Sequence, residues 1–480
     1  MEAATSETEL FINGESTPAT GEATLTLVDP ATGEEVVQVA AGTEADVDEA
    51  VASARDAVEH WTGMSTEDRA KLFLELSDAL LEREDELATL EMRDTGKPIS
   101  QARSGVRSCA RYFEYYAGVT DKIRGDSIPV GDDYVDYTVR EPLGVTGHII
   151  PWNFPLNILG RTTAPSLASG NTVVIKPDEH TPRTAVEVAR IAHEVGFPPG
   201  TINVVPGRGS RAGAALSSHP DIDGVSFTGS VETGIEVAKS AVSNVNPVHL
   251  ELGGKSPLAV FPDADLEAAA ETAVDAIFGR NAGQVCTAAS RLLVHEAVHH
   301  ELVNLVAERA GELSLGAGPD DPDVGPLVSE EQLDRVQSYV DVGRSEVGEP
   351  IIGGASPDRP GHFFEPTIFD DVDNQTRIAQ EEIFGPVLTV IEFADEREAI
   401  ELSNDVEYGL VAGVFTSDLG RAHRYAREAQ AGRVFVNDWF AGGKNAPFGG
   451  YKSSGFGREK GLEAIDSFTQ IKNVCANIEL

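Results

Sequence analysis

From about residue 140 onward, short apolar runs alternate with longer stretches in which apolar residues recur at helical spacing. The apolar runs are Val145–Ile150, Thr172–Ile175, Ile202–Val205 and Gly224–Thr228, and the helical stretches are Ala185–Val195 and the segment from Gly229 to about Ala241. Short buried strands separated by helices of about ten or more residues are typical of a parallel sheet with crossover helices. The pattern therefore predicts an α/β fold.

A second block of the same kind follows, with apolar or helical segments at Ser256–Phe261, Arg291–His295, Ala297–Leu313 and Val387–Phe393. Two segments fit neither block. Asp133–Arg140 alternates apolar and polar residues, as a half-exposed strand does, and Phe468–Ile478 also has an extended pattern. Because unpaired strand edges promote association, we predict that these segments form a β arm that pairs between subunits.

Length and cysteine content narrow the class of protein. A chain of 480 residues exceeds a single hydrophobic core, so two or three domains are expected. Its three cysteines, Cys109, Cys286 and Cys475, cannot form a disulfide framework, and none has a partner at metal-ligand spacing, so no metal is expected. The N-terminus lacks the regions of a signal peptide, and no run reaches the roughly 20 apolar residues that span a bilayer. We expect a cytoplasmic protein.

The charge is strongly negative, with 37 basic against 79 acidic residues and a net charge of −42. Acidic residues are spread along helical stretches such as Glu44–Glu59 rather than collected in a tail. Such a surface repels nucleic acid and anionic membranes, and it repels itself unless salt screens it. The composition favours a halophilic host, and an ordinary acidic cytosolic protein is the alternative.

Cys286 is the first candidate for chemistry, because it lies in the small, polar stretch Gly283-Gln284-Val285-Cys286-Thr287. A thiol nucleophile needs a nearby group that takes up its proton or activates water. Glu251, 35 residues earlier in Glu-Leu-Gly-Gly-Lys, is a carboxylate followed by glycines and could supply that group. A lone cysteine is more often a small buried hydrophobe, which is the interpretation we favour for Cys109.

Asn153 lies in Pro151-Trp152-Asn153-Phe154-Pro155, directly after the predicted strand Val145–Ile150. Ligands bind at the carboxyl ends of strands in open parallel sheets. The amide of Asn153 could therefore donate to a negative charge that develops when a thiolate attacks a carbonyl. The simpler interpretation is that Asn153 satisfies its own turn.

Several glycine-rich or charged turns could bind a dinucleotide. Lys176 and Glu179 follow the strand Thr172–Ile175, and Glu179 could accept from ribose hydroxyls and repel a 2′-phosphate, which favours NAD over NADP. Phe227-Thr228-Gly229-Ser230, followed by Gly234, predicts a strand, a glycine turn and a helix whose N-terminus faces a pyrophosphate. The turn Gly207-Arg208-Gly209 precedes another helix. Each turn has an ordinary structural interpretation as well.

Taken together, these motifs resemble the NAD(P)-dependent aldehyde dehydrogenase superfamily over essentially the whole chain. The matching motifs are Pro-Trp-Asn-Phe-Pro, Lys-Pro-x-Glu, Phe-Thr-Gly-Ser-x-x-x-Gly, Glu-Leu-Gly-Gly-Lys, Gly-Gln-x-Cys, Glu-Glu-Ile-Phe-Gly-Pro and the glycine-dense run Pro447–Glu459. The resemblance implies a Rossmann-like cofactor domain (residues 1–122 and 143–252), an α/β catalytic domain (253–452) and an oligomerisation β arm (123–142 and 465–480) in a homodimer or homotetramer.

The resemblance also implies the roles of individual residues. Cys286 would be the nucleophile, Glu251 the general base and Asn153 an oxyanion donor, and Glu459 a possible proton relay. The residues expected to hold NAD, with NADP as an alternative, are Ile150, Pro151, Trp152, Lys176, Glu179, Gly209, Gly213, Phe227, Gly229, Ser230, Gly234, Leu252, Glu382 and Phe384. The expected substrate pocket comprises Phe154, Val285, Thr287, Trp439 and Phe440.

The implied reaction is oxidation of an aldehyde to a carboxylic acid. The Cys286 thiolate attacks the aldehyde, and Glu251 activates the water that hydrolyses the resulting thioester. A CoA-acylating dehydrogenase and a catalytically silent structural protein remain alternatives, although Glu251 favours hydrolysis. The apolar, aromatic lining suits aliphatic or aromatic aldehydes, and betaine aldehyde or a semialdehyde remains open.

Overall fold

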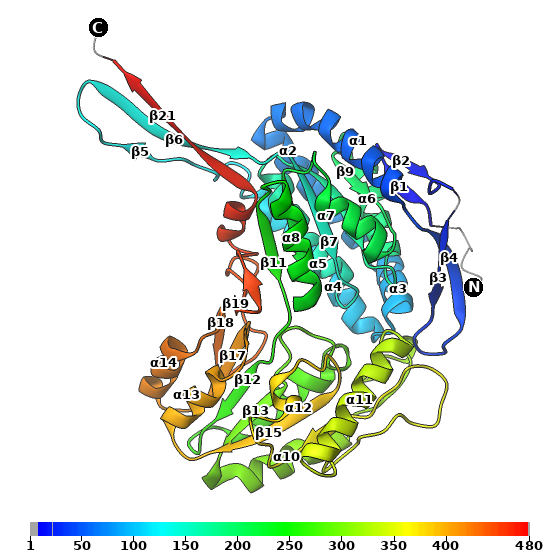
Figure 1. Cartoon of the computed structure of the whole chain (residues 1–480), viewed down its shortest axis with the longest axis vertical. Coiled ribbons are helices and arrows are strands. Elements are labelled where there is room, and N and C mark those ends of the chain that lie inside the picture. Colours follow the sequence, from blue (N-terminus) through cyan, green and yellow to red (C-terminus); the bar gives the residue numbers. More distant parts are fainter. Residues whose placement is uncertain (1–7, 22, 479–480) are drawn as a thin grey trace.

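The computed structural model describes residues 8–21 and 23–478, and it forms two α/β lobes from which a β arm projects (Figure 1). The sheet of the first lobe has eight strands in the order β2-β1-β9-β8-β7-β10-β11-β20. These strands are β1 Leu10–Ile12, β2 Glu15–Thr17, β7 Val145–Ile150, β8 Thr172–Pro177, β9 Ile202–Val204, β10 Gly224–Thr228, β11 Val248–Glu251 and β20 Gly455–Phe456. The strands from β9 to β11 are parallel, and β1 and β20 pair antiparallel at either side.

The four apolar runs of the first block are confirmed as strands β7, β8, β9 and β10. Every side chain of these four strands is buried, because helices cover both faces of a parallel sheet, and the runs are therefore apolar without alternation. From β7 the chain adds β8 and β9 on one side and then returns to place β10 and β11 on the other. This reversal of strand order leaves a crevice at the carboxyl ends of β7 and β10.

The helices of the first lobe pack on both faces of this sheet (Figure 1). They are α1 Glu44–Gly63, α2 Thr66–Glu82, α3 Glu84–Thr95, α4 Ile99–Ala117, α5 Pro155–Ala168, α6 Arg183–Glu194, α7 Ala214–Ser218 and α8 Val231–Ser243. Proline at the first position of α5 fixes the start of that helix immediately after Phe154. Ser230 caps α8, and its hydroxyl accepts from the backbone N–H of Thr233 at 3.3 Å.

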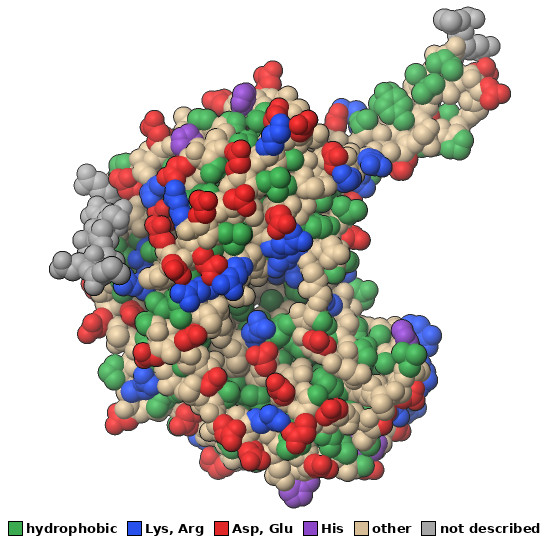
Figure 2. All heavy atoms as spheres, turned by 180° about the vertical axis from the view of Figure 1, so that it is seen from behind, with side chains coloured by type: hydrophobic (Ala, Val, Ile, Leu, Met, Phe, Trp, Pro, Cys, Tyr) green, Lys and Arg blue, Asp and Glu red, His purple; other side chains and the backbone are tan. Residues whose placement is uncertain are grey.

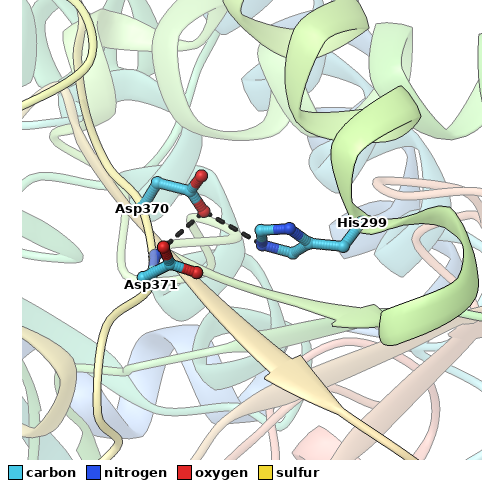
Figure 3. Close-up of side chains that lie close together, drawn as sticks. All are labelled: His299, Asp370 and Asp371. Carbon is cyan, nitrogen blue, oxygen red and sulfur yellow. Dashed lines mark hydrogen bonds and ion pairs between the residues drawn. The ribbon is translucent and has the colours of Figure 1, made fainter.

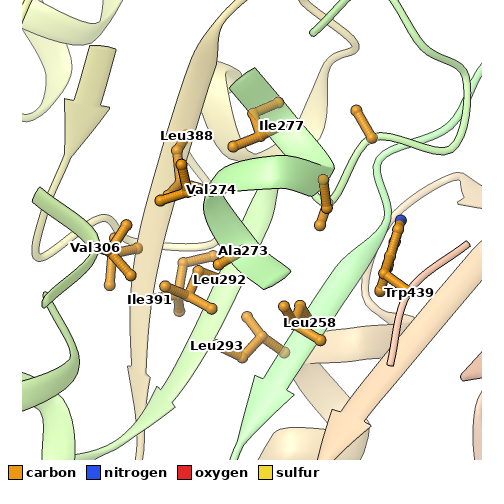
Figure 4. Close-up of a cluster of buried hydrophobic side chains, with 14 of the residues drawn as sticks. Leu258, Ala273, Val274, Ile277, Leu292, Leu293, Val306, Leu388, Ile391 and Trp439 are labelled. Carbon is orange, nitrogen blue, oxygen red and sulfur yellow. The ribbon is translucent and has the colours of Figure 1, made fainter. Parts of the chain in front are cut away.

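The second lobe contains a six-stranded parallel sheet in the order β14-β15-β13-β12-β17-β18. Its strands are β12 Pro257–Val260, β13 Arg291–His295, β14 Thr367–Phe369, β15 Val387–Phe393, β17 Val411–Phe415 and β18 Arg433–Val436. Its helices are α9 Leu266–Val274, α10 His299–Gly311, α11 Glu330–Glu346, α12 Arg377–Gln380, α13 Glu396–Asn404 and α14 Leu419–Glu428. Aliphatic side chains from the sheet and from α9 and α10 fill its core (Figure 4).

The arm joins the two segments that fit neither block. β6 Tyr134–Pro142 pairs antiparallel with β21 Thr469–Asn477 along its whole length, and β5 Ser127–Ile128 adds a third strand. The two predicted strands are therefore each other's partners within one chain. Two short antiparallel pairs complete the fold, β3 Thr24–Val28 with β4 Glu35–Ala40 and β16 Tyr408–Gly409 with β19 Tyr451–Lys452.

Acidic side chains are scattered over the face shown in Figure 2, and several of the Lys and Arg side chains on this face lie beside the hollow between the two lobes. No helix within residues 8–21 and 23–478 is long and apolar enough to cross a bilayer.

Candidate active site

A cavity of about 270 Å³ brings together the predicted catalytic residues Asn153, Glu251 and Cys286. It opens at the carboxyl ends of β7, β10 and β11, with Cys286 supplied by the loop before β13. The predicted cofactor residues that line the same cavity are Pro151, Trp152, Gly229, Ser230, Leu252, Glu382 and Phe384. Residues that are far apart in sequence therefore meet at the position where an open parallel sheet binds its ligand.

The chain reaches Cys286 through a strained turn. Asn281, Ala282 and Gly283 all have positive φ, at 47°, 53° and 74°, although such values are uncommon for residues other than glycine. A β-carbon at Gly283 would lie 2.2 Å from the carbonyl oxygen of Gly385, so only glycine fits there. Gln284 holds the turn, because its Nε2 donates to the Asn281 carbonyl at 2.9 Å. Strain of this kind is retained where it positions a functional side chain.

The side chain of Asn153 is buried and is held against the same turn. Its Nδ2 donates to the backbone carbonyl oxygen of Gln284 at 3.0 Å, and the backbone carbonyl oxygen of Asn153 accepts from Asn281 Nδ2 at 3.0 Å. One of the two amide protons of Asn153 is therefore used for positioning. The second makes no hydrogen bond among the described residues.

A buried ion pair behind Asn153 was not recognised in the sequence. Lys97 and Glu91 have fully buried side chains, and Lys97 Nζ lies 2.8 Å from Glu91 Oε1. Lys97 Nζ also donates to the carbonyl oxygen of Asn153 at 2.9 Å, and Glu91 Oε2 accepts from the backbone N–H of Leu156 at 3.2 Å. The pair thus holds both ends of the loop between β7 and α5. Lys97 lies in the run Thr95-Gly96-Lys97-Pro98, which offers no charge pattern to distinguish it from a surface lysine.

The surroundings of Cys286 disfavour ionisation of its thiol. The pKa of Cys286 is raised to about 12, mainly by burial and partly by the carboxylates of Glu251 and Glu382, whereas the charge of Arg161 lowers it. The sequence interpretation assumed a thiolate held ready in this position. Desolvation disfavours a free sulfur anion here, which favours deprotonation during attack over a thiolate formed beforehand.

Glu251 is the final residue of β11 and is almost fully buried. Neither of its carboxylate oxygens has a hydrogen-bond partner among the described residues. Burial and the nearby charge of Glu459 raise its pKa well above the usual value, whereas Arg161 opposes the shift. A carboxyl group whose pKa has moved towards neutrality is suited to general acid and base chemistry.

Glu459 lies next to Glu251 and forms a buried ion pair with Arg161. His249 approaches the same carboxylate, with its Nδ1 3.9 Å from Glu459 Oε1. The sequence singled out Glu459 but not its partner, since Arg161 lies in the middle of α5, where a charged residue is usually exposed.

The turn between β10 and α8 is shaped for close approach of a ligand. A β-carbon at Gly229 would lie 2.5 Å from the ring of Phe227, and one at Gly234 would lie 2.5 Å from Leu252. The hydroxyl of Thr228 is buried and has no hydrogen-bond partner among the described residues. A bare backbone, an unsatisfied hydroxyl and the N-terminus of α8 fit a pyrophosphate.

A second group of predicted cofactor residues meets at the carboxyl end of β8. Lys176 is buried, and β-carbons at Gly209 and Gly213 would lie 4.0 Å from its Nζ and 3.8 Å from its Cδ. Glu179 accepts from the backbone N–H of Gly209 at 2.9 Å. Lys176 and Glu179 thus lie against the π-helical segment Gly209–Gly213, which contains the two glycines.

Glu382 and Phe384 form the opposite wall of the cavity. Glu382 accepts from the backbone N–H of Gly254 at 2.9 Å, and burial raises its pKa to about 7. Phe384 has a φ of 63°, and its ring meets that of Trp152 edge to face at 5.3 Å. Gln332 and Arg335 of α11, which the sequence did not single out, hold this turn through its backbone carbonyls.

The predicted substrate-pocket residues do not line this cavity, as far as the described residues show. Trp439 instead belongs to the buried core of the second lobe (Figure 4), and its indole N–H donates to the Thr287 carbonyl at 3.0 Å. Phe154 lies under the ammonium of Lys97, 4.6 Å from the ring centre. Their role in binding substrate stays a prediction, as does that of Val285, Thr287 and Phe440.

One group of side chains within the described residues could hold a metal ion, namely His299, Asp370 and Asp371 (Figure 3). His299 Nε2 lies 3.0 Å from Asp370 Oδ1, and the group belongs to the start of α10 and the end of β14 rather than to the cleft. An ion pair accounts for this geometry.

Comparisons with known proteins agree with the site. The chain matches the Aldehyde dehydrogenase family over residues 17–474. It is 44% identical to hydroxyisobutyraldehyde dehydrogenase of Mycolicibacterium austroafricanum over 98% of this chain and 94% of that protein. The NAD+ complex of an aldehyde dehydrogenase from Bacillus cereus superimposes with a TM-score of 0.97 at 42% identity, covering 99% and 97% of the two chains. Betaine aldehyde dehydrogenase of Staphylococcus aureus with NAD+ gives 0.96 at 39% identity, covering 99% and 95%. The chain therefore belongs to the aldehyde dehydrogenase family and is an oxidoreductase that acts on aldehydes.

Proposed function

We propose that this enzyme oxidises its aldehyde through a covalent bond to Cys286, with Glu251 as base, Asn153 as oxyanion donor and NAD as cofactor. The observation that carries the proposal is the single cavity shared by these three side chains and the β10–α8 turn. Nucleophile, base and donor come from three separate parts of the chain, so their convergence is unexpected unless they act together.

Acylation begins when Cys286 attacks the carbonyl carbon. A C–S bond forms, the thiol proton moves to the buried carboxylate of Glu251, and the carbonyl electron pair moves to oxygen. The free N–H of Asn153 and the backbone N–H of Cys286 stabilise that oxyanion. Removing one such donor typically costs about 10²–10³ in turnover.

The cofactor would lie across the carboxyl ends of β8 and β10. Lys176 and Glu179 would hold its adenosine end, Ser230 and the Gly229–Gly234 turn its pyrophosphate, and Glu382 its second ribose. When bound, NAD supplies the two-electron acceptor that takes the aldehyde carbon to the oxidation level of a thioester. The carboxylate of Glu179 would repel a 2′-phosphate, which favours NAD over NADP.

Deacylation uses Glu251 a second time. The carboxylate removes a proton from water, the water oxygen attacks the thioester carbon, and the C–S bond breaks to release a carboxylic acid and the Cys286 thiolate. The neighbouring pair Glu459–Arg161 offers a route by which the Glu251 proton can leave.

Pre-steady-state kinetics test these roles. Cys286→Ala should abolish NADH formation. Glu251→Gln should slow the steady state most, because every deacylation needs this base, and it should also slow the first burst of NADH, since the thiol proton then has to pass to water. Unchanged steady-state turnover in Glu251→Gln would remove this residue from the mechanism. Adding CoA should leave the rate unchanged, and formation of acyl-CoA would instead identify an acylating dehydrogenase.

We also propose that the chain works as a homodimer or homotetramer in the cytoplasm, with residues 123–142 and 465–480 as the oligomerisation arm beside cofactor (1–122 and 143–252) and catalytic (253–452) domains. Exposed apolar side chains on the arm support this, for example Val135, Tyr137 and Ile471, which are 46%, 40% and 63% exposed. Sedimentation of Ile471→Lys should show smaller assemblies than the unaltered protein.

A further inference from the structure

Cationic side chains gather near Glu251 and Cys286, in a protein whose net charge is −42. They are Arg161 of α5, Lys444 and Lys460. Burial and the charge of Arg161 lower the pKa of Lys444 to about 8 and that of Lys460 to about 7, so the three cations share one environment. Glu459 is the carboxylate that pairs with Arg161 there. Because Glu459 neutralises Arg161, Lys444 and Lys460 give the cluster an excess of positive charge when they are protonated.

Two packed helices present polar side chains to this cluster. Asn157 and Arg161 lie one turn apart on α5, and Ser108 and Tyr112 lie one turn apart on α4. Asn157 Nδ2 donates to Ser108 Oγ at 2.7 Å, and Lys444 Nζ donates to the same hydroxyl. The polar stripe begins one turn after Asn153, at the N-terminal end of α5 nearest to Cys286.

Two donors in the stripe are unsatisfied. Arg161 Nη2 and the hydroxyl of Tyr112 are buried and have no hydrogen-bond partner among the described residues. The side chain of Arg161 is 7% exposed, and Tyr112 is fully buried. Buried donors are rarely left without an acceptor, so an acceptor that is separate from the protein is expected here. The ammonium of Lys444 lies over the face of the Tyr112 ring, 4.3 Å from its centre.

We propose that the substrate carries a second functional group, a carboxylate, that binds between Arg161, Tyr112 and Lys444 while its aldehyde meets Cys286. A carboxylate offers two oxygens to the two unsatisfied donors and neutralises the excess charge. The substrate is then a semialdehyde, a short chain with an aldehyde at one end and a carboxylate at the other. This inference rests on the proposed function, because it names the substrate of the same site.

The same charges disfavour a quaternary ammonium substrate such as betaine aldehyde. A cation would need exposed aromatic faces, whereas the rings here are already covered by cations: Phe448 lies under Arg161 at 5.1 Å and under Lys460 at 4.7 Å. A neutral aldehyde would leave the donors of Arg161 and Tyr112 unsatisfied.

The test compares aldehydes of similar size and different charge, namely 4-oxobutanoate, pentanal and betaine aldehyde, each with NAD. The value of kcat/KM for 4-oxobutanoate should exceed that for pentanal by about 10–100-fold, the range expected for charge-assisted hydrogen bonds, and betaine aldehyde should be the poorest of the three. A ratio of one or below overturns the semialdehyde proposal. If pentanal is oxidised through Cys286, the proposed function still stands, whereas failure of all three aldehydes counts against that function itself.

Substitutions test whether Lys444 and Tyr112 cause the higher kcat/KM for 4-oxobutanoate relative to pentanal. Lys444→Gln should lower the ratio about tenfold, mainly through KM for 4-oxobutanoate, and Lys444→Glu should lower it further. Tyr112→Phe, which removes one donor and keeps the ring, should also lower it. Lys71→Gln, an exposed lysine of α2 that pairs with Glu67, is the matched control and should leave the ratio unchanged. A high ratio that survives both Lys444→Glu and Tyr112→Phe refutes the assignment.

Discussion

The ammonium of Lys97 donates to the backbone carbonyl oxygen of Asn153 at 2.9 Å, and the side chain of Lys97 is fully buried. The charged side chain of Lys97 thus holds the backbone of Asn153 in position, although Lys97 itself does not contact the reacting atoms. Lys97 is a positioning residue, and its carboxylate partner Glu91 holds the next turn of the same loop through Leu156.

Lys97→Met should lower kcat about 10–100-fold, because small misplacement of a catalytic donor has effects of this size. It also leaves Glu91 buried without its partner, which costs several kcal/mol of folding stability. The measurement is kcat and KM for the folded fraction, together with the dissociation constant of NAD. Lys97→Arg should recover part of kcat, and Lys239→Gln, an exposed lysine paired with Glu236, is the control. An unchanged kcat in folded Lys97→Met would make the pair purely structural.

The pH dependence of deacylation should follow Glu251. Its pKa is raised above the usual value by burial and by Glu459, and only the ionised form can accept a proton from water. Steady-state turnover should therefore rise with pH through this raised pKa and then level off. Glu459→Gln removes a neighbouring negative charge, so the rising limb should move to lower pH even if the plateau falls.

The control for this shift is Glu463→Gln, an exposed carboxylate close in sequence. A limb that stays in place in Glu459→Gln, measured as a full profile of kcat against pH, would contradict the coupling between the two carboxylates.

The sequence predicted the parts of this molecule that have local signals. Fully buried strands such as Val145–Ile150 and Gly224–Thr228 are apolar throughout, and their bounds in the structure are the same. The motifs around Asn153, Glu251 and Cys286 could be found because glycines and prolines mark the turns that follow strands. The pairing of β6 with β21 could not, since it joins residues more than 300 positions apart.

The sequence could not reveal side chains whose meaning depends on burial. Arg161 and Lys97 are of residue types that usually lie at the surface, yet both side chains are buried. Only the fold shows that each has a specific partner. The raised pKa of Cys286 has the same origin, because desolvation is a property of the assembled cavity and cannot be inferred from the sequence.

Cofactor choice should depend on Glu179. Its carboxylate lies beside the backbone N–H of Gly209, where the adenosine ribose is proposed to bind. Glu179→Ser should raise the ratio of kcat/KM for NADP to that for NAD by about tenfold or more, because a like charge next to the 2′-phosphate is removed. Glu194→Gln, an exposed carboxylate of α6, serves as the control. The same ratio in both variants would place the selectivity elsewhere.

Substrate preference should itself change with pH. Lys444 and Lys460 have pKa values of about 8 and about 7, and both lysines are cationic only below those values. Arg161, Arg111 and Arg433 act on them and stay charged. The other titratable groups around them are Cys109, Tyr112 and Glu459. The kcat/KM ratio of 4-oxobutanoate to pentanal should therefore fall between about pH 7 and 9. The ratio is used because the effect of Glu251 is common to both aldehydes and cancels, so a flat ratio would exclude a contribution from the lysines.

Added salt should raise the free energy of unfolding of this protein. The net charge of −42 is spread over the surface, and most of its ion pairs are exposed, so repulsion between unpaired carboxylates opposes folding. At about 1 M KCl the Debye length falls to about 3 Å, which screens this repulsion but leaves the buried pair Glu91–Lys97 almost unaffected. The free energy of unfolding, measured in urea, should rise steeply between low salt and about 1 M KCl. A charge-free osmolyte such as sucrose separates screening from preferential exclusion, because it acts only through the latter. If stability is already full without added salt, or if sucrose matches KCl, the acidic surface is not an adaptation to a saline interior and the halophile hypothesis is wrong.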